Sequence, residues 1–398
     1  MTLTRRQAIN QFWMLLASSP LLRGQDSEVA QRPVHQPDRI PPVEDLVNSF
    51  EYEDVARKLL SRPLYDHIAA GAGSERTLRR NREFFDRITF RPRMLVDVSG
   101  LDLTKELFGE KMFAPILIGP TSNHRRVHPE GELATAAGAA AAKATMIVSH
   151  RSSVPAAAIA EKTGQPFWYQ VALMQDSNLT RDAIKSAVGA GAKVICLTVG
   201  NAYRPVLGRD IHNRYGKASQ ATSGEVSTKE TTPGWPPHPS RLNVQSNPKF
   251  SWDVLDQVKE WAGVPVVLKG IMSPDEASEA VTNGADGIVV SNHGGRVIDG
   301  APATIEILPK IAEEVRGRVP LLVDGGFRRG TDILKGLALG ADAVLLGRPV
   351  LWGLAGYGAE GVQKLLEMLQ SELALGMGLS GQPNLAAIDN SLVKVHRW

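Results

Sequence analysis

A histidine and an arginine lie three residues apart where an apolar run ends, and their side chains suit acid–base and anion-binding chemistry. The run Ile288–Val290 is followed by Ser291, and His293 and Arg296 are separated by two glycines. The imidazole titrates near neutral pH and can act as a general base, while the guanidinium presents a planar fork to a carboxylate. Glycines let the backbone approach a planar ligand closely. The pattern predicts a site for a carboxylic acid, although a plain surface turn would show the same residues.

Two glycine-bearing turns further along the chain have the composition of a phosphate cradle. The segment Asp324–Gly330 precedes a helical stretch, and Gly347 is followed directly by Arg348. Backbone N–H groups at a helix start and a guanidinium together bind phosphate, and one such site indicates a mononucleotide or a sugar phosphate. Lys269 ends another apolar run. Its ammonium could stabilise an anionic reduced flavin, or could form a salt bridge inside a barrel.

Short apolar runs alternate with helical stretches from residue 112 onward, which is typical of a parallel sheet covered on both faces. Eight such units predict an α/β fold, a TIM (β/α)8 barrel with an N-terminal helical extension and a long loop, residues 213–250, after strand four. An open doubly wound sheet is the alternative, but no GxGxxG turn follows the first strand. The expected strands are 112–120, 145–150, 166–173, 193–199, 265–271, 287–292, 320–326 and 343–349. The expected helices between them are 132–143, 155–162, 178–190, 274–283, 304–316 and 330–339.

The N-terminus differs from the rest of the chain. Arg5 and Arg6 precede the mostly apolar run Ala8–Leu22, which resembles a twin-arginine export signal and is too short for a comfortable membrane span. We therefore expect a signal over residues 1–24, a proline-bearing linker over 25–45 and one domain over 46–398. The signal predicts a periplasmic or otherwise exported protein. The alternative is an amphipathic helix that packs on the domain of a cytoplasmic protein.

Composition excludes some partners and some chemistry. The net charge is only +3 and no dense basic stripe is present, so nucleic acid is not an expected partner. The single cysteine, Cys196, lies in an apolar run and predicts a buried thiol without an intramolecular disulfide. No pattern of metal-ligand spacing stands out, and no metal is expected.

Several motifs in a fixed order resemble the FMN-dependent α-hydroxy-acid oxidising family, which includes glycolate oxidase, lactate dehydrogenase and oxidase, and mandelate dehydrogenase. The resemblance extends from about residue 45 to the C-terminus. It rests on Lys269-Gly270, Ser291–Arg296, Asp324–Gly330 and Gly347-Arg348, together with Tyr65-Asp66, Arg91–Arg93, Pro120-Thr121 and His128–Glu132.

The resemblance implies a role for each residue of the site. His293 would be the base, and Arg296 would bind the carboxylate of an L-2-hydroxy acid. The acid would be oxidised to a 2-oxo acid by hydride transfer to flavin N5, with a carbanion route as the other formal possibility. Oxygen, a quinone or a cytochrome would accept the electrons, and a homo-oligomer is expected. FMN would contact Pro120, Thr121, Ser122, Ser149, Gln170, Thr198, Lys269 and Ser291 through its ring and ribityl chain, and Asp324, Gly325, Gly326, Phe327, Arg328, Gly347 and Arg348 through its phosphate end.

The sequence departs from the family pattern on the substrate side. His67 replaces a tyrosine and is assigned to substrate binding. A second tyrosine is replaced by Ala172, the aspartate that orients the catalytic histidine by Gly200, and an arginine by Leu207, with Arg204 and Arg209 close enough to substitute; Arg151 and His124 add further basic character. Loss of the aspartate should lower the basicity of His293. The altered pocket leaves open an FMN oxidase of another carbon acid or amine, a flavin-binding protein without catalysis, or a non-flavin phosphate-binding barrel.

Overall fold

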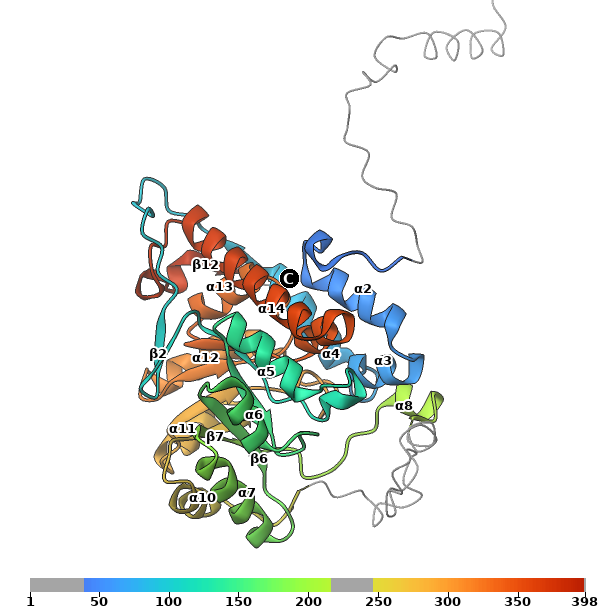
Figure 1. Cartoon of the computed structure of the whole chain (residues 1–398). Coiled ribbons are helices and arrows are strands. Elements are labelled where there is room, and N and C mark those ends of the chain that lie inside the picture. The colour runs from blue at the N-terminus through green and yellow to red at the C-terminus, as the bar shows by residue number, and fades with distance from the viewer. Residues whose placement is uncertain (1–38, 216–245, 397–398) are drawn as a thin grey trace, which may run out of the picture. The chain divides into compact units, whose positions relative to one another are not determined.

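The computed structural model describes residues 39–215 and 246–396, and its centre is a closed barrel of eight parallel strands (Figure 1). Each strand pairs with its neighbours in chain order, and β11 closes the ring onto β4. The predicted TIM barrel is confirmed. The strands are β4 Ile116–Ile118, β5 Thr145–Ser149, β6 Phe167–Ala172, β7 Ala192–Thr198, β8 Val266–Ile271, β9 Gly287–Val290, β10 Leu321–Val323 and β11 Ala343–Leu346.

Helices connect the strands and cover the outside of the barrel, and all six predicted helices are present with ends within two residues of the prediction. Their starts follow ordinary capping rules: Ser273 accepts from the backbone N–H of Glu276 ahead of Pro274. The helices are α5 Glu132–Ala141, α6 Ala156–Thr163, α7 Ser177–Gly189, α10 Val254–Ala262, α11 Pro274–Thr282, α12 Thr304–Val315, α13 Gly330–Ala338 and α14 Arg348–Leu379.

The first predicted strand is wrong in its extent. Residue 112 belongs to a hairpin formed by β2, Lys105–Leu107, and β3, Glu110–Met112, and the barrel strand begins only at Ile116. Pro115 separates the two elements, because it lacks the N–H that a continuous ladder needs. Strands six to eight also end earlier than predicted, since the polar and glycine-bearing residues after them form turns. Those turns carry the site.

The inside of the barrel is a packed core rather than a channel. Trp168 and Cys196 are fully buried in a cluster with other inward-facing apolar residues. Phe108 at the tip of the hairpin packs edge-on against Trp168, with ring centroids 5.4 Å apart, and covers the start of β9. Burial raises the pKa of the Cys196 thiol to about 12, so the predicted buried thiol is confirmed. The hairpin covers the end of the barrel where the strands start, so we expect ligands to bind at the carboxyl ends of the strands.

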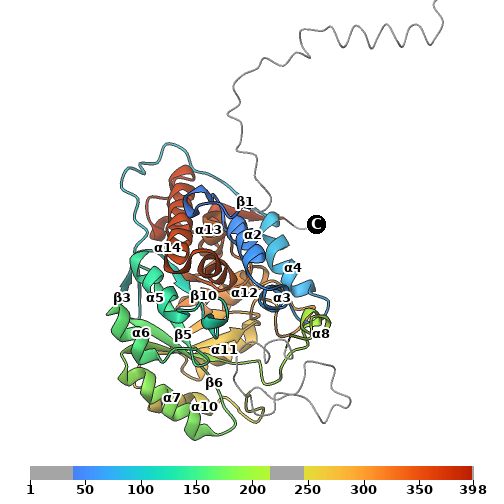
Figure 2. The same ribbon diagram turned by 45° about the vertical axis from the view of Figure 1, so that its right-hand side comes forward.

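The N-terminal helical extension reaches the carboxyl ends of the strands. Its elements are η1 Val43–Asp45, α2 Ser49–Leu59, α3 Arg62–Ala69, α4 Arg76–Glu83 and η2 Phe84–Arg87. The Asn48 side chain caps α2 by accepting from the backbone N–H of Phe50 and Glu51. The backbone N–H of Ala72 donates to the carbonyl of Gly295, and α3 lies beside the short helix α8, Gly208–His212, as Figure 2 shows. The chain before the barrel therefore forms one wall of the strand-end mouth.

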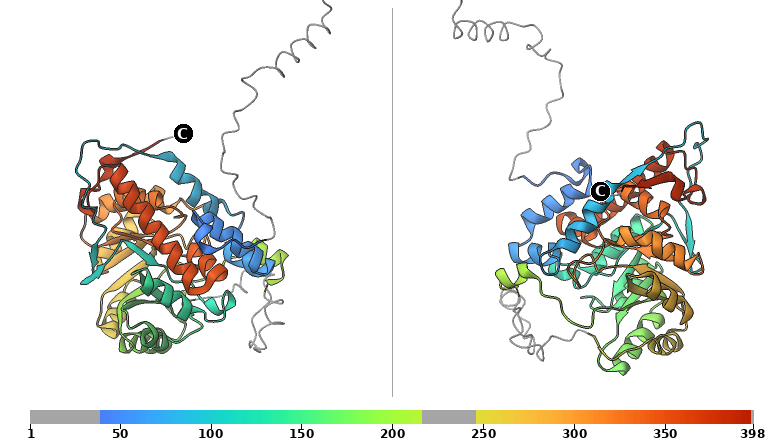
Figure 3. Two further views of the ribbon diagram at one scale, coloured as in Figure 1. Left: turned by 45° about the horizontal axis from the view of Figure 1, so that its top comes forward. Right: turned by 180° about the vertical axis from the view of Figure 1, so that it is seen from behind.

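The C-terminal helix α14 runs alongside α5 and α2 (Figure 3) and is kinked at Tyr357 and Gly358. The short elements η5 Leu385–Ala387 and η6 Asn390–Leu392 follow, and β12, Val393–Val395, pairs antiparallel with β1, Ile88–Phe90. One compact unit extends from Pro42. In the described residues no helix is long and apolar enough to cross a membrane. The expected export signal, most of the linker and most of the 213–250 loop lie outside the described residues.

Candidate active site

A cavity opens at the carboxyl ends of the strands, and its empty space amounts to roughly 1130 Å³, part of which is open solvent. This is where a TIM barrel carries its chemistry. All but four of the predicted site residues line it. They are His67, Pro120, Thr121, Ser122, Lys269, His293, Arg296, Asp324, Gly325, Gly326, Phe327, Arg328, Gly347 and Arg348.

The other four predicted residues lie behind this lining as buried, hydrogen-bonded groups. Ser149 Oγ donates to Gln170 Oε1 at 3.0 Å, and Gln170 Nε2 donates to Thr198 Oγ1 at 2.8 Å. Ser149 and Thr198 end β5 and β7, and Gln170 lies near the end of β6 between them, so the row crosses three neighbouring strands. Ser291 Oγ accepts from Lys269 Nζ at 2.7 Å. The side chains of these four residues are thus held in place by hydrogen bonds to other side chains of the strand ends.

The loop after β9 aims His293 and is held in a strained conformation. His293 has φ of 57°, a left-handed value that a non-glycine residue adopts only when its surroundings impose it. Asn292 and Asn81 exchange two side-chain hydrogen bonds of 2.8 Å, and the His293 N–H donates to Ser291 Oγ at 3.1 Å. This pair of buried amides ties the loop to α4. The sequence reasoning missed Asn81, which carries no signal by itself.

His293 lies among cations and has no hydrogen bond to a carboxylate within the described residues. Burial is the largest effect on its imidazole, followed by Lys269, Arg296, Arg348 and Arg151, and together they lower its pKa to about 3. Gly200, which has φ of 80°, stands where the family resemblance places an aspartate. The imidazole is therefore neutral at neutral pH and able to accept a proton.

Arg296 and Arg348 are held under the C-terminal end of α3. Arg296 Nη1 donates to the carbonyl oxygens of His67 at 2.8 Å and Ala70 at 2.9 Å. Arg348 donates through Nε to Ile68 O and through Nη2 to Ala70 O, both at 2.8 Å. Unsatisfied carbonyls at a helix end favour cations. Arg296 keeps Nε and Nη2 without a protein acceptor in the described part of the chain.

Arg328 and Arg348 line the end of the cavity that suits a phosphate, and Arg296 lies beside Arg348, because both donate to the carbonyl oxygen of Ala70. Burial is the largest cause that lowers the pKa of Arg348, to about 9, and the charges of Arg296 and Arg328 act in the same direction. Gly326 belongs to the adjoining turn, has φ of 87°, and leaves no room for a Cβ, which would lie 2.0 Å from the carbonyl oxygen of Asn81. A buried cluster of like charges is relieved by an anion, and a phosphate dianion fits it.

Lys269 forms the salt bridge inside the barrel that is one interpretation of its sequence position, and its contact with a flavin stays a prediction. Its ammonium pairs with Asp324 Oδ2 at 2.8 Å and still lines the cavity. The other oxygen, Asp324 Oδ1, is buried and has no hydrogen-bond partner. A buried carboxylate oxygen without a donor is costly, and a ligand hydroxyl, such as one of a ribityl chain, would satisfy it. The orphaned oxygen and the guanidinium cluster together fit FMN.

The predicted contact of Phe327 with the cofactor can come from its backbone but not from its side chain. The Phe327 side chain is buried in the core and packs edge-on against Phe85, with ring centroids 5.0 Å apart. A large apolar side chain after β10 gains more from this core contact than from a polar phosphate site. Phe327 can therefore serve the cavity through its backbone, whose carbonyl already accepts from Arg328 at 2.9 Å.

The proposed substitutes for the missing carboxylate-binding arginine do not face the cavity. Arg209 forms ion pairs with Glu75 at 2.7 Å and Asp66 at 3.6 Å, and Leu207 is buried. Neither Arg204 nor Arg151 is among the residues that line the cavity. A guanidinium with two carboxylates in reach stays with them, because the alternative leaves buried charge unpaired.

His124 does not line the cavity either, but it is linked to a residue that does. The ring is fully buried; its Nε2 lies 2.7 Å from Thr121 Oγ1 and its Nδ1 lies 2.8 Å from Thr135 Oγ1. Burial lowers its pKa. His124 therefore contributes a neutral ring that orients the Thr121 hydroxyl rather than positive charge in the pocket.

Three residues that the sequence reasoning missed surround His67. Its Nδ1 lies 2.9 Å from a carboxylate oxygen of Asp210, and Tyr215 stacks on its ring with centroids 4.1 Å apart and planes within 7°. Arg126, in η3, His124–Arg126, donates to the Tyr215 hydroxyl at 3.4 Å. Asp210 and Tyr215 stand at the edge of the segment that the sequence indicates to be an insertion. Nothing in their spacing links them to His67.

Comparison with known proteins places the chain in a family that the cavity fits. Residues 56–395 match the FMN-dependent dehydrogenase family, and the chain belongs to it. It is therefore an FMN-dependent oxidoreductase, and the resemblance seen in the sequence is confirmed. Among similar proteins, an L-lactate oxidase of Nostoc sp. is 43% identical over 360 residues, which cover 87% of this chain and 98% of the relative.

Two further similarities extend over the same region. A peroxisomal (S)-2-hydroxyacid oxidase of Arabidopsis thaliana is 41% identical over 359 residues, covering 88% of this chain and 97% of the relative. A crystal structure of mandelate oxidase with 3,3-difluoro-2-hydroxy-3-phenylpropionic acid superposes with a TM-score of 0.79 at 36% identity, covering 88% of this chain and 100% of the other.

Proposed function

We propose that this protein oxidises L-2-hydroxy acids to 2-oxo acids with FMN as its cofactor and oxygen as its electron acceptor. The observation that carries the proposal is that a buried, neutral histidine, His293, and an arginine with free N–H groups, Arg296, face one cavity that ends in a phosphate-suited cation cluster. The similar L-lactate, (S)-2-hydroxyacid and mandelate oxidases support the substrate class and the acceptor.

The residues of the cavity divide the work of binding and proton transfer. Arg328 and Arg348 would hold the phosphate of FMN, and Asp324 Oδ1 would accept a hydrogen bond from its ribityl chain. When bound, FMN supplies the acceptor for the two electrons that leave the substrate carbon. Arg296 holds the substrate carboxylate through Nε and Nη2, and His293 accepts the proton of the 2-hydroxyl group.

The low pKa of His293 keeps it in the form that accepts a proton. The same cations that lower this pKa also oppose the imidazolium that forms during the reaction, since the described residues give His293 no carboxylate partner. The anionic phosphate and carboxylate of the two ligands lie among those cations and offset them. The basicity of His293 therefore increases when both ligands are bound.

Product stoichiometry tests the proposal. The FMN-loaded protein is mixed in air with L-2-hydroxy acids of increasing side-chain size, and with the D enantiomers as controls. The proposal predicts one 2-oxo acid and one hydrogen peroxide per acid consumed. Formation of a 2-oxo acid only when a quinone or cytochrome is added would contradict oxygen as the acceptor while leaving the oxidation itself intact.

We also propose that the chain is exported folded through the twin-arginine route. Arg5, Arg6 and the apolar run that follows support this, and an export route for folded proteins suits a chain that loads a cofactor first. Replacement of both arginines by lysine should leave the protein in the cytoplasmic fraction of its host. An unchanged distribution between fractions would contradict export.

A homo-oligomer remains a prediction, which light scattering of the purified protein checks.

A further inference from the structure

The cavity contains a second histidine that, unlike His293, is backed by a carboxylate. We propose that His67 and Asp210 form a proton-loaded carboxylate site, in which the substrate carboxylate binds the imidazolium form of His67 and binding takes up one proton. The proposal rests on the proposed function, because it concerns the same acidic substrate. It goes further, because it makes acid binding depend on a proton held by the protein.

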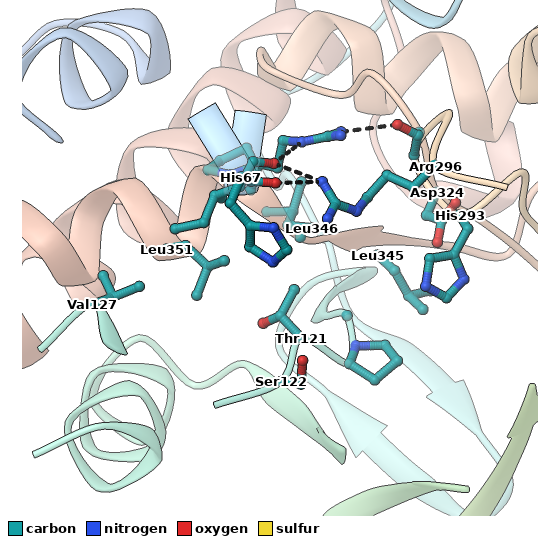
Figure 4. A pocket seen from close by; sticks show the side chains of 18 of the residues that line it. His67, Thr121, Ser122, Val127, His293, Arg296, Asp324, Leu345, Leu346 and Leu351 are labelled. Carbon is teal, nitrogen blue, oxygen red and sulfur yellow. Dashed lines mark hydrogen bonds between the residues drawn. The ribbon is translucent and has the colours of Figure 1, made fainter. Parts of the chain in front are cut away.

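The geometry fixes which nitrogen of His67 meets a ligand. Both oxygens of Asp210 lie within hydrogen-bond distance of Nδ1, at 2.9 Å and 3.0 Å. Asp210 therefore keeps a proton on Nδ1, and Nε2 is the free nitrogen, since no described residue hydrogen-bonds to it. The His67 side chain is 22% exposed and that of Asp210 only 5%. Figure 4 shows the ring reaching into the cavity above Thr121, with His293 at the right of the same view.

The surrounding elements hold this ring rigidly. Tyr215 covers one face of it at a centroid distance of 4.1 Å. Helix α8, which carries Asp210, is tied to α3 by the hydrogen bond from Asn213 Nδ2 to Asp66 Oδ2 at 2.7 Å and by the Arg209–Asp66 ion pair at 3.6 Å. Arg209 also pairs at 2.7 Å with Glu75, which stands at the N-cap position of α4. A His–Asp pair fixed on two linked helices is pre-organised to present Nε2 in one direction.

The charges around His67 oppose its protonation until an anion arrives. Burial is the largest effect and lowers its pKa; Arg296 and Arg126 act in the same direction, and the hydrogen bond and charge of Asp210 act against them. Tyr215 is the other titratable group in contact, and burial raises its pKa away from neutrality. A carboxylate placed between Arg296 and His67 offsets the cations. Its binding therefore raises the His67 pKa and draws a proton.

The site adds a cation where the family resemblance places an arginine. Leu207 is buried at that position, and Arg209 is held by Glu75 and Asp66. Arg296 and Arg126 are permanent cations that line the cavity near His67, and His67 adds a further one that exists only when protonated. Affinity for an acid should then fall as pH rises, by up to about tenfold per pH unit for one linked proton.

Binding of oxalate to the FMN-loaded protein tests the proposal without turnover, because oxalate carries no hydroxyl to oxidise. Calorimetry between pH 6 and 9, in buffers with different heats of ionisation, measures the protons taken up, and the flavin absorbance gives the affinity. About one proton per oxalate is expected, with affinity that falls as pH rises. Wild-type binding without proton uptake would overturn the proposal.

Variants assign the proton to one histidine. H67Q should abolish the uptake and leave a weaker, pH-independent affinity, while H293Q should retain the uptake. D210N should shift the uptake to lower pH, because the imidazolium loses its counter-charge. His212 is exposed on the same helix, and H212Q is the matched control that should behave as the wild type. Uptake that persists in H67Q, or is lost in H293Q instead, would overturn the proposal.

The outcome is separable from that of the proposed function. Proton uptake with oxalate that depends on His67, in a protein whose flavin no hydroxy acid reduces, would refute 2-hydroxy-acid oxidation and leave a carboxylate site. Oxidation of hydroxy acids with an affinity that is independent of pH and of His67 would support the function and refute this inference.

Discussion

Lys269 and Asp324 form a buried ion pair of 2.8 Å in which one carboxylate oxygen, Asp324 Oδ1, is left without a donor. The pair joins the ends of β8 and β10 and faces the cavity at the same time. The ion pair thus links two strands at the mouth of the barrel and also offers a hydrogen-bond acceptor to a ligand. We expect a ligand donor to bind at the unsatisfied oxygen, Asp324 Oδ1.

Removing Lys269 should destabilise the protein and weaken its hold on FMN. K269M leaves the Asp324 carboxylate buried and unpaired, which costs about 3–5 kcal/mol when a buried pair is broken. Thermal or urea unfolding of the ligand-free protein measures this cost. K105M is the matched control, because Lys105 pairs with Asp342 on a more exposed surface and should cost less than about 1 kcal/mol. Equal costs for the two variants would contradict the burial argument.

Arg348 should matter for the phosphate of the cofactor and little for its ring. R348Q is expected to weaken binding of FMN but hardly that of riboflavin, which lacks the phosphate; fluorescence titration of the ligand-free protein with both flavins measures the difference. Arg329, which pairs with Glu372 and does not line the cavity, provides the control R329Q. A similar loss for riboflavin would show that Arg348 supports the fold of the site instead.

The titration of His293 predicts how stability depends on pH in the ligand-free protein. Its pKa is lowered to about 3 from the usual 6.5 of a histidine, so the unfolded chain binds this proton first as pH falls. The contribution of the neutral, buried ring to the free energy of unfolding is fully present above pH 6.5. It is lost progressively as the pH falls towards 3. Urea unfolding across this range should show a shallower dependence in H293Q. An unchanged dependence would mean that other groups dominate.

The Asn81–Asn292 pair should position the base. N81A leaves a buried amide of Asn292 without its partner, which costs roughly 1–3 kcal/mol, and frees the loop that strains His293. We expect kcat to fall while FMN stays bound, because the loop relaxes away from the reactive geometry. Steady-state kinetics beside the flavin spectrum measures both. Normal kcat in a destabilised protein would show that the clamp serves stability alone.

The sequence was informative wherever local chemistry decides the structure. Short apolar runs that alternate with helical stretches predicted the barrel and its helices, and glycine-bearing turns predicted a phosphate site, because each pattern depends on neighbours in the chain. The first strand was extended too far because the apolar residues on both sides of Pro115 were given more weight than the proline, which lacks the N–H of a continuous ladder. The pairs His67–Asp210 and Asn81–Asn292 join residues 143 and 211 positions apart, and no local pattern announces such contacts.

Anaerobic reduction of the bound FMN tests the central claim most directly. The purified protein, with its flavin spectrum recorded, is mixed without oxygen with L-2-hydroxy acids while the visible flavin band is followed. We predict bleaching by at least one L acid, none by its D enantiomer, and a rate slower by about 10²–10⁴-fold in H293A, the range that one general base contributes. A flavin that stays oxidised with every acid would contradict the assigned function. Reduction of the flavin in H293A at the wild-type rate would contradict the role of His293.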